Sequence, residues 1–168
     1  SDKMEPVMNK VKAASVNDLK RILYLPRFLP YRLTKLSGTV SRDLAAQYSA
    51  TFDLTIPEWR IVALLGSRPG LTAREIAPLA SLDKVSISRA VERLVKSKRL
   101  EKRTLDGDRR SAALYLTEAG MTCLRKIIPI AQQYEDQLLE GFTPEEIEQL
   151  DGFLNRLDAK AEALKKGD

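Results

Sequence analysis

Three tetrapeptides of the form Thr-x-x-Glu mark the beginnings of helices along this chain. They are Thr55–Glu58, Thr72–Glu75 and Thr143–Glu146. In such a capping box the threonine hydroxyl accepts a hydrogen bond from an early helical N–H, and the glutamate accepts one from the backbone N–H of the threonine. Pro57 and Pro144 fall in the first helical turn, where a missing N–H costs nothing. We therefore expect a mainly helical chain, with a helix after each tetrapeptide.

A further helix is predicted from about Lys84 to about Lys96, with Asp83 as its N-cap. At 100° per residue its apolar residues fall on one narrow stripe: Ile87, Ala90, Val91, Leu94 and Val95. The opposite face and its flanks carry small polar and basic side chains beside one valine: Lys84, Val85, Ser86, Ser88, Arg89, Arg93 and Lys96. The helix before it meets Pro78, which cannot donate a hydrogen bond, so that helix should end near Ala77.

The periodicity then changes from helical to alternating. Residues 100–105 and 112–116 predict two short strands, and the charged residues 106–110 form the turn between them. Thr117 is expected to cap a long helix that continues to about Leu139 and is kinked at Pro129. The middle of the chain therefore reads as three short helices followed by a hairpin with a charged tip.

Long amphipathic helices are expected on both sides of this central unit. Leucine and valine recur at helical spacing between Leu29 and Leu44, and a second apolar stripe runs from Ile147 to Leu164. Residues 1–14 are expected to be mobile. Together the two stripes exceed what a 60-residue core could cover, so they need each other or a second chain.

Charge is distributed unevenly over the 168 residues, whose formal net charge is +5. Residues 84–110 contain ten basic and four acidic residues, a local net charge of +6. Residues 135–151 contain seven acidic residues and no basic one, and the first 42 residues contain nine basic against three acidic. A basic stripe is typical of nucleic-acid-binding proteins, although a solvated charged face is the more common outcome.

The composition excludes several classes of function. The chain has no histidine and one cysteine, so intramolecular disulfides, Cys/His zinc sites and histidine catalysis are excluded. It has no glycine-rich phosphate loop and no nucleophile–base pair, so we expect no enzyme, no cofactor and no metal. It has no apolar run of about 18 residues, and its first residues lack an apolar signal segment, which predicts a cytoplasmic protein without membrane contact.

Helix, helix, turn, basic helix and hairpin is the order of a winged helix-turn-helix, and three segments of it resemble the MarR (multiple antibiotic resistance regulator) family. Residues 54–65 resemble its second helix and residues 85–94 its recognition helix. Asp108-Arg109-Arg110 followed by Leu116-Thr117-x-x-Gly120 resembles its wing and the junction after it. The resemblance covers roughly residues 28–160. Pro78 and Pro129 depart from the family pattern, at positions that do not face DNA.

The resemblance implies a homodimer in which two winged domains bind a pseudo-palindromic site on double-stranded DNA. Residues 1–49 and 118–168 would supply the dimerisation helices, and residues 50–117 the winged helix-turn-helix domain. A small organic effector would bind in the crevice between these parts. We therefore predict a sequence-specific transcriptional regulator, a repressor released by such an effector. The alternative is a winged-helix adaptor that docks an acidic protein partner.

The predicted DNA contacts come from the recognition helix and the wing: Lys84, Val85, Ser86, Ser88, Arg89, Arg93, Arg103, Arg109 and Arg110. Arg89 and Arg93 would contact a guanine edge and phosphate, unless Glu92 or Glu101 pairs with them on a solvated face. Arg109 is favoured as the arginine inserted into the minor groove, but Arg110 is not excluded.

Four residues are candidates for the effector crevice: Phe28, Tyr31, Trp59 and Arg60. Trp59 has the alternative role of an ordinary core residue. Cys123 lies after the wing, and we interpret it as a small buried hydrophobe rather than a redox sensor.

Overall fold

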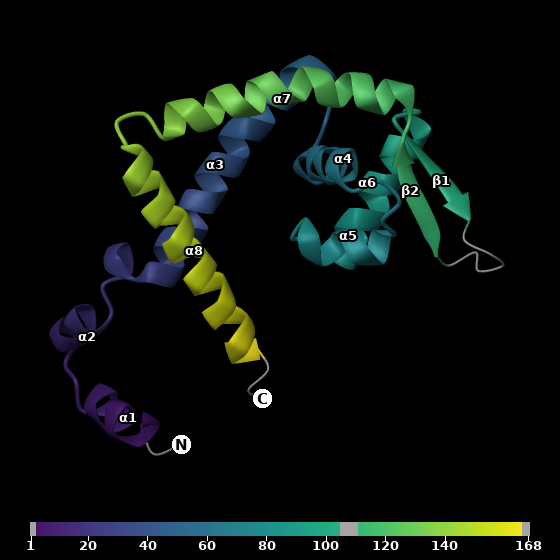
Figure 1. The fold of residues 1–168 in the computed structure, drawn as a ribbon. Helices are drawn as coiled ribbons and strands as arrows, with labels where there is room; N and C mark the ends of the chain where they lie inside the picture. Colours follow the sequence, from purple (N-terminus) through teal and green to yellow (C-terminus); the bar gives the residue numbers. More distant parts are fainter. Residues whose placement is uncertain (1–2, 105–110, 166–168) are drawn as a thin grey trace.

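The computed structural model describes residues 3–104 and 111–165, and it is mainly helical with one small antiparallel sheet (Figure 1). The helices before the central unit are α1 (Met4–Lys12), α2 (Val16–Ile22), a short 3₁₀ turn η1 (Leu25–Arg27) and α3 (Leu29–Phe52). The central unit contains α4 (Ile56–Ser67), α5 (Ala73–Leu79), α6 (Lys84–Lys96), β1 (Leu100–Thr104) and β2 (Ala112–Leu116). The chain continues through α7 (Glu118–Leu138) and α8 (Pro144–Lys165). This architecture confirms the predicted mainly α winged helix-turn-helix fold.

The predicted caps position the helices of the central unit. The backbone N–H of Thr55 donates to Glu58 Oε2 at 2.7 Å and that of Thr72 to Glu75 Oε2 at 2.8 Å, and both threonine hydroxyls accept the reciprocal bonds. At Thr143 the hydroxyl accepts from the backbone N–H of Glu146 at 3.1 Å. The capping boxes at Thr55 and Thr72 are therefore confirmed, and they define where α4 and α5 begin.

Helix α5 ends at Leu79, two residues later than predicted. Pro78 lies in its last turn, where a proline does not have to end the helix. Only one hydrogen bond is lost there, and the N–H of Ala80 still donates to the carbonyl of Ile76 at 2.8 Å. Ser81 then takes a left-handed conformation with φ of 52°, and the chain enters α6. The proline thus sharpens the turn before α6 without removing the helix.

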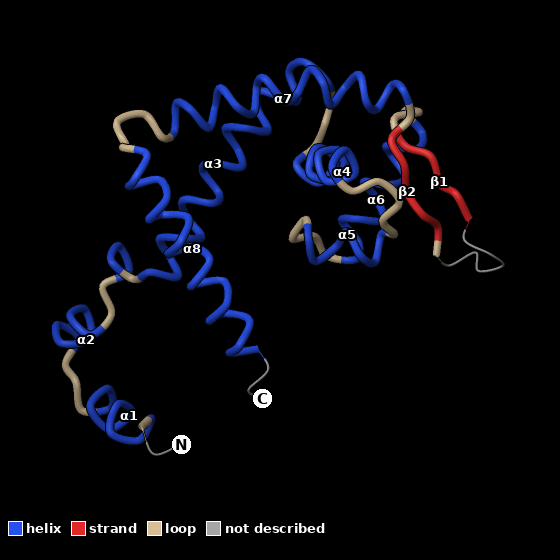
Figure 2. The backbone as a smooth tube through the Cα atoms, viewed as in Figure 1, coloured by secondary structure: helices blue, strands red, loops and turns tan. Residues whose placement is uncertain are grey.

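The wing is held against the helices by its second strand. β1 and β2 pair antiparallel, with Leu100 opposite Leu116 and Thr104 opposite Ala112 (Figure 2). On its other edge the backbone of Leu114 bonds to Gly70 and Leu71 at 2.9 Å each. The loop between α4 and α5 is therefore bonded to the outer edge of β2, and these bonds fix the direction of the hairpin relative to α6.

One apolar core joins the central unit to its neighbours. Ile61, Ile76 and Leu94 are essentially unexposed, and Tyr48 from α3 and Ile127 from α7 are buried with them. The core thus extends across both boundaries drawn from the sequence, at residues 49 and 117. Four of the five predicted stripe residues of α6 are buried, and Val95, at the end of the stripe, is 36% exposed.

The long helices continue beyond this core. In Figure 1, α7 crosses above α3 and the central unit, and α8 turns back from its far end. All described residues of α8 except Ile147 are exposed. Helices α1 and α2 were not anticipated from the sequence, and they stand apart at the N-terminal end. No helix in the described ranges is long and apolar enough to cross a membrane.

Candidate nucleic-acid interface

Helix α6 begins at a cap that also involves one of the predicted contact residues. The backbone N–H of Ser86 donates to Asp83 Oδ1 at 2.7 Å, and its hydroxyl donates to Asp83 Oδ2 at 2.8 Å. These two bonds, the backbone one first, lower the pKa of the Asp83 carboxyl below its ordinary value. Ser86 is therefore held at the helix start, and its hydroxyl proton is committed to the cap.

The outward face of α6 is polar, basic and open to solvent. Lys84, Val85, Ser88 and Arg89 are all exposed, and 58% of the Val85 side chain is open to solvent. Within the described ranges Arg89 forms no ion pair, so Glu92 and Glu101 do not neutralise it. The Arg89 guanidinium is therefore available to contact a base edge in a DNA groove or a phosphate group.

Arg93, in contrast, is paired with a residue of another helix. Its Nε lies 2.8 Å from Oε1 of Glu58, whose side chain is 3% exposed, while the Arg93 side chain is 56% exposed. The partner is neither Glu92 nor Glu101, the two acids considered from the sequence. Glu58 also accepts the capping bond of Thr55, so one buried carboxylate ties the start of α4 to α6.

The two basic residues of β1 point to different surroundings. Arg103 binds Glu101 Oε1 through Nη2 at 2.6 Å and lies 4.0 Å from the ring centre of Tyr115. Lys102 instead lines a groove shared with α6. Lys102 is therefore a stronger candidate for a phosphate contact than Arg103. The predicted contact of Arg103 with DNA remains a prediction. Arg109 and Arg110 lie outside the described residues.

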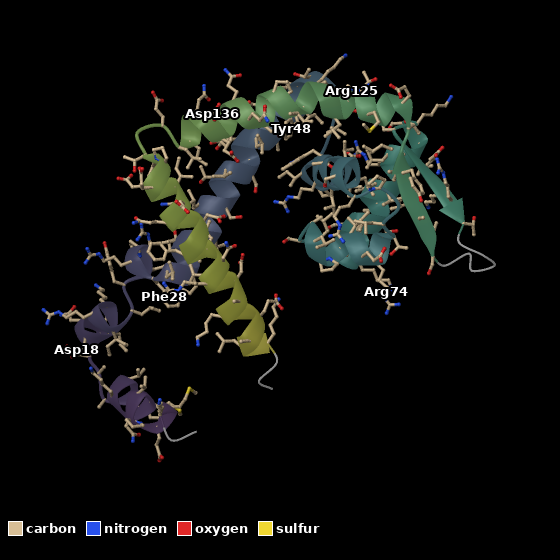
Figure 3. The ribbon with its side chains drawn as sticks, viewed as in Figure 1. Asp18, Phe28, Tyr48, Arg74, Arg125 and Asp136 are labelled. Atoms are coloured by element: carbon tan, nitrogen blue, oxygen red, sulfur yellow. The ribbon has the colours of Figure 1, made fainter. Side chains whose placement is uncertain are left out.

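This groove, of about 920 Å³, is formed by α5, α6 and the hairpin. Its basic residues are Arg74, Lys84 and Lys102, and Glu92 is its acid. Arg74 was missed by the sequence analysis, which considered only α6 and the wing, although its place in the first turn of an exposed helix is readable. Figure 3 shows the Arg74 side chain directed away from the helices. The groove adds positive charge beside the outward face of α6.

A second cavity, of about 640 Å³, lies between α3, α4 and α5. Trp59 and Arg60 line it together with Ser37 and Ala80. Arg60 crosses it: Nη2 donates to Ser41 Oγ and Nη1 to the carbonyl of Ala80, at 3.3 Å each. One guanidinium thus connects α3 to the turn that leads into α6.

Within this chain, the four residues predicted to line the effector crevice do not lie together. Trp59 is half-buried, with its ring centre 5.2 Å from that of Tyr48. Its Nε1 and the Tyr48 hydroxyl are buried without a hydrogen-bond partner in the described part of the chain. Phe28 precedes α3, and Figure 3 places it far from Tyr48. Neither Phe28 nor Tyr31 is among the residues that line the cavity.

Cys123 lies in the apolar core and is 6% exposed. Burial raises the pKa of its thiol above the ordinary value, with smaller opposing effects from Arg99 and Lys126. The thiol is therefore kept protonated and covered, as expected of a small hydrophobe. Residues 3–104 and 111–165 contain no cluster of three or more metal-ligating acids or cysteines.

Comparison with known proteins gives one consistent family. A sequence model described as MarR family matches residues 52–111. The HTH-type transcriptional regulator BilQ of Clostridium symbiosum is 31% identical over 102 residues, which are 61% of this chain and 71% of that protein.

Solved structures agree with these sequence matches. The crystal structure of a MarR/EmrR family transcriptional regulator from Acinetobacter sp. ADP1 aligns with a TM-score of 0.77 and 29% identity, over 83% of this chain and 98% of that one. A MarR family regulator from Listeria monocytogenes, complexed with a 26mer DNA, has the same fold at 18% identity, with a TM-score of 0.73 over 82% of this chain and 93% of that one.

Proposed function

The chain belongs to the MarR family of transcriptional regulators, and on that basis we propose that it is a homodimeric repressor of a pseudo-palindromic operator, released by a small organic effector. Membership of a family of regulators also means that it is not an enzyme. The proposal retains the cytoplasmic location expected from the sequence and the division into dimerisation helices (residues 1–49 and 118–168) and a DNA-binding domain (residues 50–117).

The observation that carries the proposal is the exposed face of α6 beside the basic groove. An α-helix fits the major groove, and residues near its N-terminus reach the base edges. Arg89 is exposed and has no acidic partner within the described ranges, which suits bidentate bonding to a guanine. Lys84, Lys102 and Arg74 line the groove formed by α5, α6 and the hairpin, and they suit phosphate contacts that fix the position of the helix.

The other predicted contacts take supporting roles in this arrangement. Val85 is exposed and suits a thymine methyl, and Ser88 allows close approach to the backbone. Arg93 is held by Glu58, so we assign it a phosphate contact made by a side chain of fixed position. In the wing, Arg109 is proposed to enter the minor groove, with Arg110 as the alternative.

Release by an effector is proposed at the cavity between α3, α4 and α5. Trp59 offers an aromatic wall, and Arg60 offers a cation that already joins α3 to the turn before α6. A ligand that engaged Arg60 would compete for these two hydrogen bonds, and the position of α6 depends on that turn. The proposal for this site rests on Trp59 and Arg60, because Phe28 and Tyr31 do not line the cavity.

Selection of bound sequences from random duplexes tests the proposal. We expect enrichment of a pseudo-palindrome whose half-sites are about one helical turn apart, as two symmetric recognition helices require. Affinity for the selected duplex should fall steeply with added salt, because each neutralised phosphate releases counterions. Failure to enrich any sequence would contradict the proposal, and it would favour the adaptor that docks an acidic protein.

A further inference from the structure

The turn between α6 and β1, residues 97–99, is tied to the start of α7. Lys98 has a φ of 59°, a left-handed conformation that residues with a Cβ rarely adopt. The Thr117 hydroxyl donates to the carbonyl of Lys98 at 2.6 Å, and the Thr117 N–H donates to that of Arg99 at 3.1 Å. A strained backbone of this kind persists only where the surrounding bonds hold it. The backbone that leaves α6 is therefore fixed to the cap of α7.

The side chain of Arg99 ties the same turn to the end of α3. Its Nη2 donates to the carbonyl of Phe52 at 2.8 Å, across 47 positions of the sequence. Phe52 is the last residue of α3, where carbonyls lack partners within the helix and the helix dipole is negative. Arg99 is half-buried, unlike the exposed basic residues of the outward face of α6. Its guanidinium therefore serves the joint between helices and does not extend the DNA-facing surface.

This bond acts together with the bond of Arg60 to fix a direction. The apolar core also joins α3 to the central unit, but apolar contacts are not directional. Arg60 bonds to Ser41 at 3.3 Å, and Arg99 bonds to Phe52 at 2.8 Å. At a rise of 1.5 Å per residue, these two anchor points lie about 16 Å apart along α3. Two directed bonds so far apart oppose rotation of the central unit on α3.

We propose that Arg99 is a positioning residue for DNA binding. By holding the turn after α6 at the end of α3, it fixes the angle of α6 on the flanking helices α3 and α7. The inference rests on the homodimer and the pseudo-palindromic operator of the proposed function. In a two-fold dimer any rotation of the central unit is repeated, so it changes the separation and the twist between the two copies of α6. Arg99 thus sets the half-site spacing that the protein accepts, from a position outside the DNA-facing surface.

Operators of altered spacing test this role. One base pair inserted between the half-sites moves them apart by about 3.4 Å and rotates them by about 35°. A rigid dimer binds such a duplex only by deforming it, which costs affinity. Fluorescence anisotropy would measure the Kd for the selected operator, for the same operator with one inserted base pair, and for a duplex with a single half-site. We define the spacing ratio as the Kd for the inserted duplex divided by the Kd for the operator.

Three variants separate the bond of Arg99 from its charge. Arg99→Met fills the space of the arginine stem but cannot donate, and we expect it to lower the spacing ratio about tenfold with half-site binding unchanged. Arg99→Lys keeps a charged donor beside Phe52 and should recover part of the ratio. Lys96→Met is the matched control, because it removes the same charge from an exposed position of α6; its spacing ratio should match the wild type.

An unchanged spacing ratio in Arg99→Met would overturn the inference. Loss of half-site binding in that variant would also overturn it, since Arg99 would then be needed by the central unit itself. Equal losses on all three duplexes with a shallower salt dependence would make Arg99 a phosphate contact instead. A wild-type chain that selected no operator would refute the proposed function and the inference with it. A wild-type chain that selected an operator, with a spacing ratio that Arg99→Met left unchanged, would refute only the inference.

Discussion

At the scale of single residues, Glu58 stands out because it is the one charged side chain in the described ranges that is buried. It accepts the capping bond of Thr55 and pairs with Arg93, so it serves the start of α4 and the middle of α6 at once. The local half of this role was predicted, since a capping box is visible within four residues. The pair with Arg93 joins positions 35 apart in the sequence, and only the packing of α4 on α6 brings them together.

Replacement of Glu58 should therefore cost more than the loss of a cap. Glu58→Ala leaves the backbone N–H of Thr55 without an acceptor and Arg93 without its counter-charge, and we expect a loss of about 2 kcal/mol in the free energy of unfolding. Urea denaturation measures it. Glu92→Ala, at an exposed position of α6 without an ion pair in the described residues, should stay within about 0.5 kcal/mol. Equal losses in the two variants would contradict the role given to Glu58.

At the scale of elements, the helix starts were read correctly because a cap is a local signal. The end of α5 was missed because a proline in the last turn removes only one hydrogen bond and does not have to end the helix. The N–H of Ala80 still donates to the carbonyl of Ile76, and in the turn that follows the N–H of Leu82 donates to the carbonyl of Ala77, at 2.8 Å each. Helices α1 and α2 were not predicted because short amphipathic segments are marginal by themselves, and only a covering partner decides their structure.

The caps of α5 and α6 predict a pH dependence. The pKa of Glu75 is lowered by bonds from Thr72, the backbone one first, and that of Asp83 by bonds from Ser86. A carboxylate whose pKa is lower in the folded chain stabilises it above the unfolded pKa, near 4, and loses this effect as pH falls through the folded pKa. Asp83→Asn keeps an N-cap acceptor but does not titrate. Acid titration followed by circular dichroism should therefore show a weaker loss below about pH 4 for Asp83→Asn; an unchanged curve would contradict this.

The junction between β2 and α7 depends on a glycine. A Cβ on Gly120 would overlap the carbonyl oxygen of Arg99, and that carbonyl is fixed by a 3.1 Å bond from the N–H of Thr117. We expect Gly120→Ala to lower the free energy of unfolding by about 1–3 kcal/mol. Gly152→Ala is the control, because nothing lies within 4 Å of its Cβ position in α8. It should stabilise by up to about 1 kcal/mol through helix propensity. Thermal denaturation that gave both variants the same sign would refute the close approach.

At the scale of the whole molecule, the sequence predicted the fold, and it predicted that the apolar stripes of the flanking helices need each other or a second chain. The excess of apolar residues in the flanking helices was visible as periodicity, and the structure leaves those faces exposed on α3 and α8. The site was predicted less completely. The outward face of α6 followed from a helical wheel, but the groove with Arg74 and Lys102 requires the hairpin to lie against α5, which no local pattern shows.

A substitution on the apolar stripe of α8 should separate the dimer without unfolding the chain. Leu157 is 39% exposed, so Leu157→Asp removes little from the core of one chain but places a charge in the proposed interface. We expect the Kd of the dimer to rise at least tenfold, corresponding to about 1.4 kcal/mol, with helix content unchanged. Ala159→Asp, at an exposed position on the face of α8 opposite the stripe, should leave the dimer intact. Sedimentation velocity that found Leu157→Asp as dimeric as Ala159→Asp would exclude α8 from the interface.

The central claim is that α6 reads DNA sequence through Arg89, and the most direct test compares two duplexes. Fluorescence anisotropy would measure the affinity of wild type, Arg89→Ala and the control Lys126→Ala for the selected operator and for a random duplex at one salt concentration. We predict that Arg89→Ala loses about 1–3 kcal/mol on the operator and little on the random duplex, with the control unchanged on both. Equal losses on the two duplexes, or no loss on the operator, would contradict direct readout by Arg89.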